Sequence, residues 1–249
     1  MDINMGRRNF GAGALTAPLP AVLVSVGTME ECNILTIGWT GILSTHPART
    51  YISVRPTRHS YKILKDTGEF VIGLTSAKMA RAVDYAGVYT GAKVDKLSAL
   101  GLTKCESRAV SAPTIAECPL ALECRVVEVI PMGTHDVFIA DILSVSCDDS
   151  ILDENGRICL DRADLLAYAH GEYFALGEKI GRFGFSTQKR GGKKESVKPE
   201  QKKRIAPPHA REEERKSTAE AKRPFYLDAP RGKGAKGKPH SVKAKRGKR

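Results

Sequence analysis

Residues 33–61, NILTIGWTGILSTHPARTYISVRPTRHSY, are the stretch that decides how the chain folds. β-Branched and aromatic side chains recur at residues 33–40 and 50–54, which predicts two strands, the first of them continuing to Thr45. The apolar positions of residues 60–67 recur at helical spacing, which predicts a short helix after the second strand. We therefore expect a β-rich domain in which a helix begins directly behind a strand.

Short β-rich segments continue outward from this stretch in both directions. The other predicted strands are residues 21–26, 69–74, 120–130 and 137–146, and the other predicted helices are residues 76–86 and 93–101. Residues 131–136 join the last two strands as a hairpin whose tip carries His135. The regular strand–helix alternation of a doubly wound sheet is missing. The expected fold class is mainly β, a barrel or sandwich with small helical inserts.

The formal net charge of +12 is unevenly distributed along the chain. Residues 1–186 hold 18 Lys and Arg against 21 Asp and Glu, a balance of −3, whereas residues 187–249 hold 22 against 7, a balance of +15. The second segment has too few apolar residues to offset an ordering entropy of about 1–2 kcal/mol per residue. We expect a flexible N-terminus at residues 1–14, a folded domain at 15–186 and a disordered Lys/Arg-rich tail at 187–249.

The basic tail keeps one alternative function open. A segment of +15 binds nucleic acid or an acidic surface weakly and without sequence preference, with an affinity that falls as salt rises. Its single Phe and single Tyr provide poorly for stacking on bases. The alternative is therefore a dimeric scaffold whose tail binds a polyanion.

The cysteines and the N-terminal residues bear on compartment. The six cysteines form no CxxC pair, so neither a zinc site nor a dithiol redox motif is indicated, and reduced thiols favour a cytoplasmic protein without a metal. Arg7 and Arg8 loosely imitate a twin-arginine export signal. However, Pro18 and Pro20 interrupt the apolar segment behind them, and cleavage would remove the strand predicted at residues 21–26. No uninterrupted apolar run is long enough to predict a membrane span.

Sequence motifs of nucleotide-binding turns, zinc proteases and serine hydrolases are missing from the chain. Instead, several segments in the same order resemble the flavin reductase-like family of FMN-binding split-barrel proteins, in particular its flavoredoxin branch. They are residues 33–61, VDYAGVYTGAKVDKL at 83–97, IAECPLALECRVVEVIPMGTHDVFIADI at 115–142 and LLAYAHGEYFALGEKIGRFGFS at 165–186. The resemblance covers about residues 15–186. It implies a Greek-key split barrel, a homodimer, and FMN bound near the subunit interface.

The resemblance gives the segment after the second strand a role in holding the FMN phosphate. A dianion needs positive charge and hydrogen-bond donors, and the free N–H groups of a helix N-terminus supply both. The residues expected there are Arg55, Arg58, Ser60 and Tyr61, with Ser53 at the ribityl chain and phosphate. On the residues alone, Arg55 and Arg58 are equally consistent with solvated surface charges.

The same resemblance places residues 33–45 along the isoalloxazine ring, whose edge needs hydrogen-bond partners. Backbone amides are expected from Gly38, Trp39, Thr40 and Gly41, and side chains from Asn33, Thr36, Ser44 and Thr45. The glycines permit close approach of the backbone. A lone tryptophan is more often a core residue, and the resemblance favours flavin contact for Trp39 instead.

Two lysines extend the implied site. Lys93 and Lys96 lie in the family's Gly-x-x-x-Asp-Lys segment, which in a dimer can reach the flavin of the neighbouring subunit. A positive charge near the pyrimidine edge would favour the reduced anionic ring. The alternative for both lysines is an exposed helix face.

Histidines and aromatic residues complete the implied site. His135 in the hairpin tip is expected beside the flavin and the nicotinamide, as the catalytic residue that places the reductant or donates a hydrogen bond. Its alternative is a turn histidine capped by Asp136. His170, Tyr173 and Phe174 are expected to border the flavin or the dimer contact.

The function that follows from the resemblance is an FMN-binding oxidoreductase. NAD(P)H would deliver hydride to the flavin, and the reduced flavin would pass electrons to a second flavin, a redox partner protein or another acceptor. An FMN-containing electron carrier that does not use NAD(P)H directly is the alternative within the family.

Overall fold

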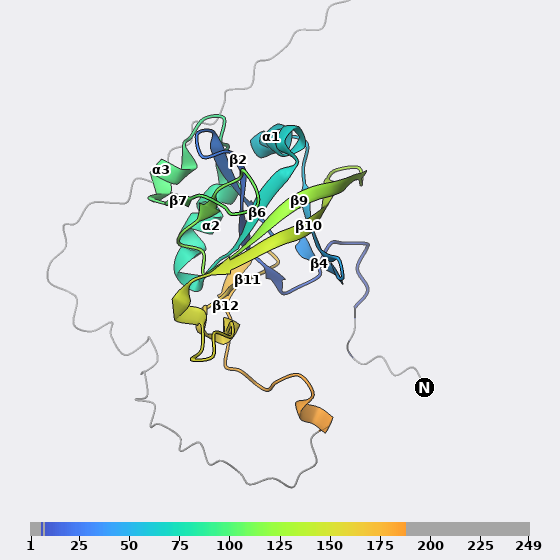
Figure 1. Ribbon diagram of the computed structural model, residues 1–249. Helices are drawn as coiled ribbons and strands as arrows, with labels where there is room; N and C mark the ends of the chain where they lie inside the picture. The colour runs from blue at the N-terminus through green and yellow to red at the C-terminus, as the bar shows by residue number, and fades with distance from the viewer. Residues whose placement is uncertain (1–5, 7, 188–249) are drawn as a thin grey trace, which may run out of the picture. The chain divides into compact units, whose positions relative to one another are not determined.

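Seven antiparallel strands form the main sheet of the computed structural model, which describes residue 6 and residues 8–187 (Figure 1). Their order across the sheet is β3-β2-β6-β9-β10-β5-β4. They are β2 (Val22–Gly27), β3 (Cys32–Ile37), β4 (Thr40–Thr45), β5 (Ala48–Val54), β6 (Glu69–Leu74), β9 (Leu120–Pro131) and β10 (Asp136–Cys147). The predicted mainly β fold with small helical inserts is confirmed. The tail expected to be disordered lies outside the described residues, apart from Thr187.

The two edge strands of the main sheet are β3 and β4. These strands are consecutive in the chain, and the backbone of Trp39 between them accepts a hydrogen bond from the Ser53 amide at 3.0 Å. A single strand from residue 33 to 45 was predicted, and that prediction was wrong. β3 pairs with β2, whereas β4 pairs with β5, so the chain must leave one edge and join the other at Gly38 and Trp39.

Alternation along the strands separates the barrel interior from its outer surface. On β5, Ile52 and Val54 point inward and are almost fully buried, whereas Tyr51 and Ser53 point outward. The interior residues are Val22, Val24, Val26, Leu35, Ile37, Ile52, Val54, Leu64, Phe70, Ile72, Cys124, Phe138 and Ala140. The outward positions of β5 are therefore free to line a binding site.

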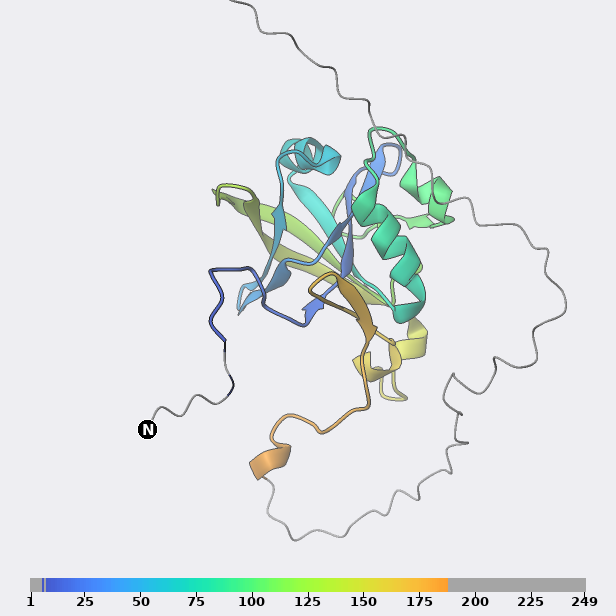
Figure 2. The same ribbon diagram turned by 180° about the vertical axis from the view of Figure 1, so that it is seen from behind.

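Three helices lie around the barrel: α1 (His59–Thr67), α2 (Ala80–Val88) and α3 (Lys96–Leu100). α1 ends at Gly68, whose φ of 65° fits the left-handed cap that glycine tolerates. α2 packs on the outer face of β3 through a second apolar cluster that includes Ile34, Val83 and Leu97. Figure 2 shows α2 across this side of the sheet. One-turn 3₁₀ helices occupy Ala77–Met79, Asp149–Ile151, Leu160–Arg162 and Phe185–Thr187.

Two small sheets were not predicted from the sequence. β1 (Leu19–Pro20), β11 (Leu166–Ala169) and β12 (Glu172–Ala175) form one of them, and β7 (Lys104–Cys105) pairs with β8 (Thr114–Ile115) in the other. A two-residue turn joins β11 to β12, with φ of 50° at His170 and 94° at Gly171. Positive φ at both positions is what a tight hairpin turn requires. The turn therefore fixes where the His170 ring can reach.

Three further observations concern metal sites, membrane-spanning helices and the cysteines. In the described ranges, no three His, Cys, Asp or Glu side chains gather as a metal site, and no helix is long and apolar enough to cross a membrane. All six cysteines lie in these ranges and are free thiols. Burial raises the pKa of Cys118 and of Cys124 to about 12, so both stay protonated at neutral pH.

Candidate functional site

A cavity of about 200 Å³ opens at the N-terminus of α1. Arg58 is the N-cap residue of this helix, and its side chain makes no capping hydrogen bond. The Tyr61 amide donates to the Arg58 carbonyl at 3.0 Å, whereas the amides of His59 and Ser60 come too early in the helix to find a partner within it and remain available to a ligand. The cavity is lined by Asn33, Leu35, Arg55, Thr57, Arg58, His59, Ser60, Tyr89, Thr90, Gly91 and Lys96. No Asp or Glu is among these lining residues.

Three cationic side chains share this cavity: Arg55, Arg58 and Lys96. None of them takes part in a salt bridge within residues 8–187. One guanidinium nitrogen of Arg58 donates to the Gly87 carbonyl at 2.8 Å, which holds the side chain against the end of α2. Positive charge without a carboxylate beside it, next to a helix N-terminus, is an arrangement that binds an anion.

The wall of the cavity opposite α1 is formed by β3 and the segment that precedes α3. The side-chain amide of Asn33 donates from Nδ2 to the Ser60 hydroxyl at 2.5 Å, so β3 and α1 are joined at the cavity. A Cβ added at Gly91 would lie 2.3 Å from the Asn33 side-chain oxygen. Only glycine allows this approach, and Gly91 therefore sets the width of the cavity.

A second cluster, made of Trp39, Arg55 and His135, lies beside the first. The Trp39 and His135 rings are tilted by 42° with centroids 4.6 Å apart, and 40% of Trp39 is exposed. The Arg55 Nε donates to His135 Nε2 at 3.3 Å, and the Thr134 hydroxyl lies 2.9 Å from Nδ1. Because Nε2 accepts a hydrogen bond, the proton of the neutral imidazole lies on Nδ1. Burial and the charges of Arg55 and Arg58 lower the pKa of His135, which favours this neutral form.

The hairpin tip is fixed by a separate contact. The Tyr61 hydroxyl donates to Asp136, which anchors the first residue of β10 to α1. Asp136 thus holds Tyr61, and no hydrogen bond between Asp136 and His135 occurs in the described structure. Arg55 lines the cavity at the α1 N-terminus and contacts His135, so one surface runs from the α1 N-terminus to Trp39.

Trp39 separates two further cavities of about 330 and 310 Å³. Residues 14, 16 and 19 of the N-terminal segment line both of them. The first is completed by Tyr51, Ser53 and Val137, and the second by Leu15, Tyr168, His170 and Gly171. Two other predicted residues, Ser53 and His170, therefore lie in the cavities that Trp39 lines.

Several predicted residues make contacts of their own rather than facing these cavities. The Thr36 hydroxyl donates to the Val83 carbonyl of α2, and the Thr40 hydroxyl donates to the Tyr51 carbonyl at 2.6 Å. The Tyr173 hydroxyl donates to Asp84 at 3.3 Å, and burial raises the pKa of Tyr173 to about 12.

The two predicted glycines lie near tyrosine rings. A Cβ added at Gly38 would be 3.9 Å from Tyr168, and one at Gly41 would be 3.3 Å from Tyr51. Phe174 is 47% exposed on β12.

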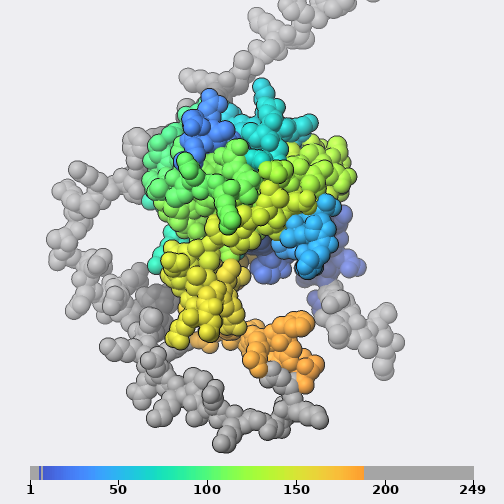
Figure 3. All heavy atoms as spheres, in the orientation of Figure 1, coloured from blue at the N-terminus to red at the C-terminus, as the bar shows by residue number. Residues whose placement is uncertain are grey.

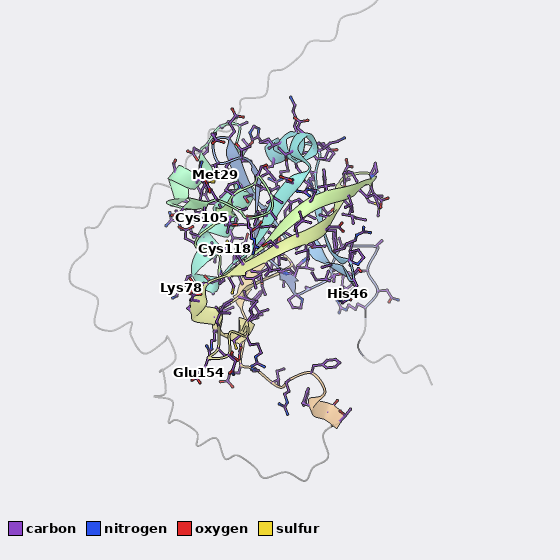
Figure 4. The ribbon with its side chains drawn as sticks, viewed as in Figure 1. Met29, His46, Lys78, Cys105, Cys118 and Glu154 are labelled. Atoms are coloured by element: carbon purple, nitrogen blue, oxygen red, sulfur yellow. The ribbon has the colours of Figure 1, made fainter. Side chains whose placement is uncertain are left out.

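Three predicted residues are not brought to these clusters. Ser44 and Thr45 lie at the opposite end of β4 from Trp39, where they pair with Arg49 and Ala48. Figure 4 shows His46 at this hairpin turn, away from Met29 in the β2–β3 turn. Lys93 is exposed and lines an adjoining cavity of about 760 Å³, which shares Asn33, His59, Gly91 and Lys96 with the first. Ser44 and Thr45 are close to Trp39 in sequence, but the direction of β4 carries them away from it.

Sequence reasoning missed five side chains that line the cavity at the α1 N-terminus. They are Leu35, Thr57, His59, Tyr89 and Thr90. The position of Thr57 and His59 between Arg55 and Ser60 was a usable signal, because a turn that enters a helix presents consecutive residues to a ligand. Tyr89 and Thr90 reach the cavity through the packing of α2 on β3, which local patterns do not report.

Comparison with known proteins assigns the chain to a family. Residues 15–177 fit the family model described as flavin reductase like domain. The chain belongs to the flavin reductase-like family. The predicted family membership is thereby confirmed.

Solved structures of flavin reductase-like proteins share this fold. A flavoredoxin from Desulfovibrio vulgaris (Miyazaki F) is 30% identical and has a TM-score of 0.68. The alignment covers 73% of this chain and 100% of that one. An FMN-binding protein from Thermus thermophilus is 24% identical, with a TM-score of 0.61 that covers 71% and 99% of the two chains. The first supports the flavoredoxin branch, and the second shows the fold alone.

Curated sequences add relatives without a described activity. An uncharacterized protein from Archaeoglobus fulgidus is 35% identical over 136 residues, which are 55% of this chain and 76% of that protein. An uncharacterized protein from Pyrococcus abyssi is 30% identical over 168 residues, which are 68% and 96% of the two chains.

Proposed function

We propose that this flavin reductase-like protein is an FMN-binding oxidoreductase, which takes electrons from NAD(P)H and passes them to a second flavin, a redox partner protein or another acceptor. The observation that carries the proposal is the cavity without carboxylates at the α1 N-terminus, continuous through Arg55 and His135 with Trp39. Membership of the flavin reductase-like family and likeness to a flavoredoxin support a flavin as the ligand.

The residues at the α1 N-terminus fit the phosphate of FMN. Two guanidinium groups, the Ser60 hydroxyl and the amides of His59 and Ser60 provide charge and donors for a dianion. Ser60 is held by Asn33, so its position is set before a ligand arrives. In this assignment Arg55 and Arg58 carry most of the electrostatic attraction.

Trp39 and the backbone around it fit the flat ring of the flavin. When bound, FMN supplies hydride and electron-transfer chemistry at its ring. Trp39 offers a partly exposed aromatic surface, and residues 38–41 offer backbone groups at the start of β4. His135, held by Arg55 and Thr134, forms the wall on which the reductant would be placed. Both of its ring nitrogens are engaged, so we assign it positioning of the reductant.

The visible absorption spectrum tests this proposal most directly. The purified protein, supplied with FMN and made anaerobic, should show flavin bands that bleach on addition of NADH or NADPH. Bands that bleach only with dithionite would replace direct NAD(P)H use by electron transfer from another protein. A protein that takes up no FMN would contradict the proposed cofactor.

Substitution of His135 separates positioning from binding. His135→Ala should slow flavin reduction by NAD(P)H about tenfold or more, because the reductant loses the surface that orients it. FMN affinity should change little, since Arg58 and the α1 N-terminus are untouched. Rapid-mixing absorbance measures the rate, and His46→Ala, at the β4–β5 turn, is the control. A parallel loss of FMN affinity and rate would show that His135 is structural.

The predicted homodimer is a further part of the proposal. Apolar side chains are exposed on β4 and on the β9–β10 hairpin, whose surfaces adjoin in Figure 3. They are Ile42, Leu43, Val127, Leu143 and Val145, with exposed fractions of 63, 51, 46, 41 and 50%. Exposed apolar groups that gather on one surface of a sheet are typical of a protein–protein contact. The scaffold role of the basic tail concerns residues outside the described ranges.

A further inference from the structure

Lys96 is the most deeply buried cation of the described chain. Its side chain, at the start of α3, is only 4% exposed. The ammonium nitrogen donates to the Ile34 carbonyl at 2.8 Å and to the Ala86 carbonyl at 2.7 Å. An ammonium has three N–H donors, so two are engaged by β3 and α2. Burying such a charge is costly unless an opposite charge lies beside it.

The charges around Lys96 do not include its counter-ion. Arg55, Arg58 and His59 face the shared cavity from the turn and the start of α1. Asp95, its neighbour, accepts hydrogen bonds from the Ser98 amide and hydroxyl, and Lys96 forms no salt bridge with any described carboxylate. Lys96 also lines the adjoining cavity of about 760 Å³, where the titratable residues are Glu31, Cys32, His59, Asp66, Lys93 and Asp95.

These surroundings disfavour the charged form of Lys96. Burial and, next, the charge of Arg58 lower the pKa of Lys96 to about 8. Cys32 does not titrate in the same range, because burial raises the pKa of its thiol to about 11. An anion in the cavity would reverse the effect on Lys96, since it supplies the missing opposite charge.

We propose that Lys96 is a buried counter-charge for the flavin phosphate, and that binding of the phosphate is coupled to protonation of this side chain. The inference rests on the proposed function, because the anion is the phosphate of FMN. It differs from the role expected from sequence, in which Lys96 reaches the flavin of a neighbouring subunit. Here the Lys96 of each subunit acts on the cavity of its own chain, between β3 and α2.

The coupling has a definite sign. Below about pH 8 the empty site already holds charged Lys96, and FMN binds without taking up a proton. Above about pH 8 the empty site loses that proton, while the complex retains it. FMN affinity should therefore fall, by at most about tenfold per pH unit for a single proton. Riboflavin, which has the same ring but no phosphate, should show no such fall.

The test is a titration of the full chain with FMN and with riboflavin, followed by flavin fluorescence from pH 6.5 to 9.5. We expect wild-type affinity for FMN to drop about tenfold between pH 8 and 9.5. Calorimetry at pH 9 in two buffers of different ionisation enthalpy should show nearly one proton taken up. Lys96→Met should bind FMN about tenfold more weakly at pH 7 and lose the pH dependence. Lys93→Met, three residues away and exposed, should behave as wild type.

Lys96→Arg guards against a folding defect, because arginine stays charged throughout this range. It should retain FMN binding and show no fall above pH 8. A wild-type affinity for FMN that is flat from pH 8 to 9.5, or a Lys96→Met variant that keeps the wild-type slope, would overturn the proposal.

Failure of the proposed function has a different signature. If neither flavin binds, the same pH series with inorganic phosphate, read as the increase in Tm, tests Lys96 alone. A phosphate effect that weakens above pH 8 in wild type and is pH-independent in Lys96→Arg supports the counter-charge role. The same effect in both proteins contradicts it.

Discussion

Replacing Arg55 and Arg58 together by methionine should weaken FMN binding by about 100- to 10,000-fold and leave riboflavin binding nearly unchanged. Each guanidinium is expected to make a charge-assisted hydrogen bond worth about 1.5–3 kcal/mol, and each 1.4 kcal/mol is a factor of ten. Both side chains line the cavity at the α1 N-terminus, and neither forms a salt bridge in the described structure. Fluorescence titration with the two flavins measures the difference.

The matched control for this pair is Arg49→Met. Arg49 lies on β5, and Arg55 directly follows the same strand. Unlike Arg55, Arg49 forms a salt bridge, with Asp141 at 2.7 Å. FMN affinity should survive this change. Equal FMN affinity in the double variant and the wild type would place the phosphate elsewhere. An equal loss for riboflavin would point to damage at the His135 contact instead.

Gly73→Ala should destabilise the barrel by about 3 kcal/mol or more, at the upper end of what overpacking costs. A Cβ at Gly73 would lie 2.5 Å from the Cys118 sulfur and 3.0 Å from its Cβ. Gly73 lies on β6, between Leu23 of β2 and Ala121 of β9. The strand cannot shift without breaking a ladder on one side. Figure 4 marks where Cys118 lies. Urea unfolding should show a lower midpoint for Gly73→Ala than for the wild type.

A second substitution makes this prediction specific. Cys118→Ala removes the sulfur atom, so it should restore part of the stability that Gly73→Ala loses, as a double-mutant cycle detects. Gly177→Ala is the control, because no atom lies within 4 Å of a Cβ at that position. Additive effects of the two substitutions at positions 73 and 118 would mean that the clash is relieved in some other way.

Sequence patterns located most strands because alternation and turn residues are local signals. The predicted strand at residues 69–74 coincides with β6, and the predicted 120–130 and 137–146 differ from β9 and β10 by one residue at their ends. The break at Gly38 and Trp39 was not visible, because it is imposed by pairing with β2 on one side and β5 on the other. Pairing partners are a property of the whole sheet.

The candidate site divides in the same way. Arg55, Arg58 and Ser60 could be grouped from sequence, since a turn that enters a helix brings neighbours together. For Lys96 the sequence left an exposed helix face open, and that alternative was wrong, because Ile34 and Ala86 draw the side chain inside. Likewise, no local pattern shows that Trp39 lies beside His135, 96 positions later in the chain.

The placement of β3 and β4 at opposite edges governs the order in which the domain can assemble. Although only two residues join them, β3 pairs with β2 and β4 pairs with β5, so Trp39 reaches its place only after β2, β6, β9, β10 and β5 have aligned between the two edges. Long-range pairing of this kind forms late and slowly in folding. The aromatic surface proposed for the flavin is therefore a late product of folding, and a chain with an open barrel has the arginines but not the tryptophan in place.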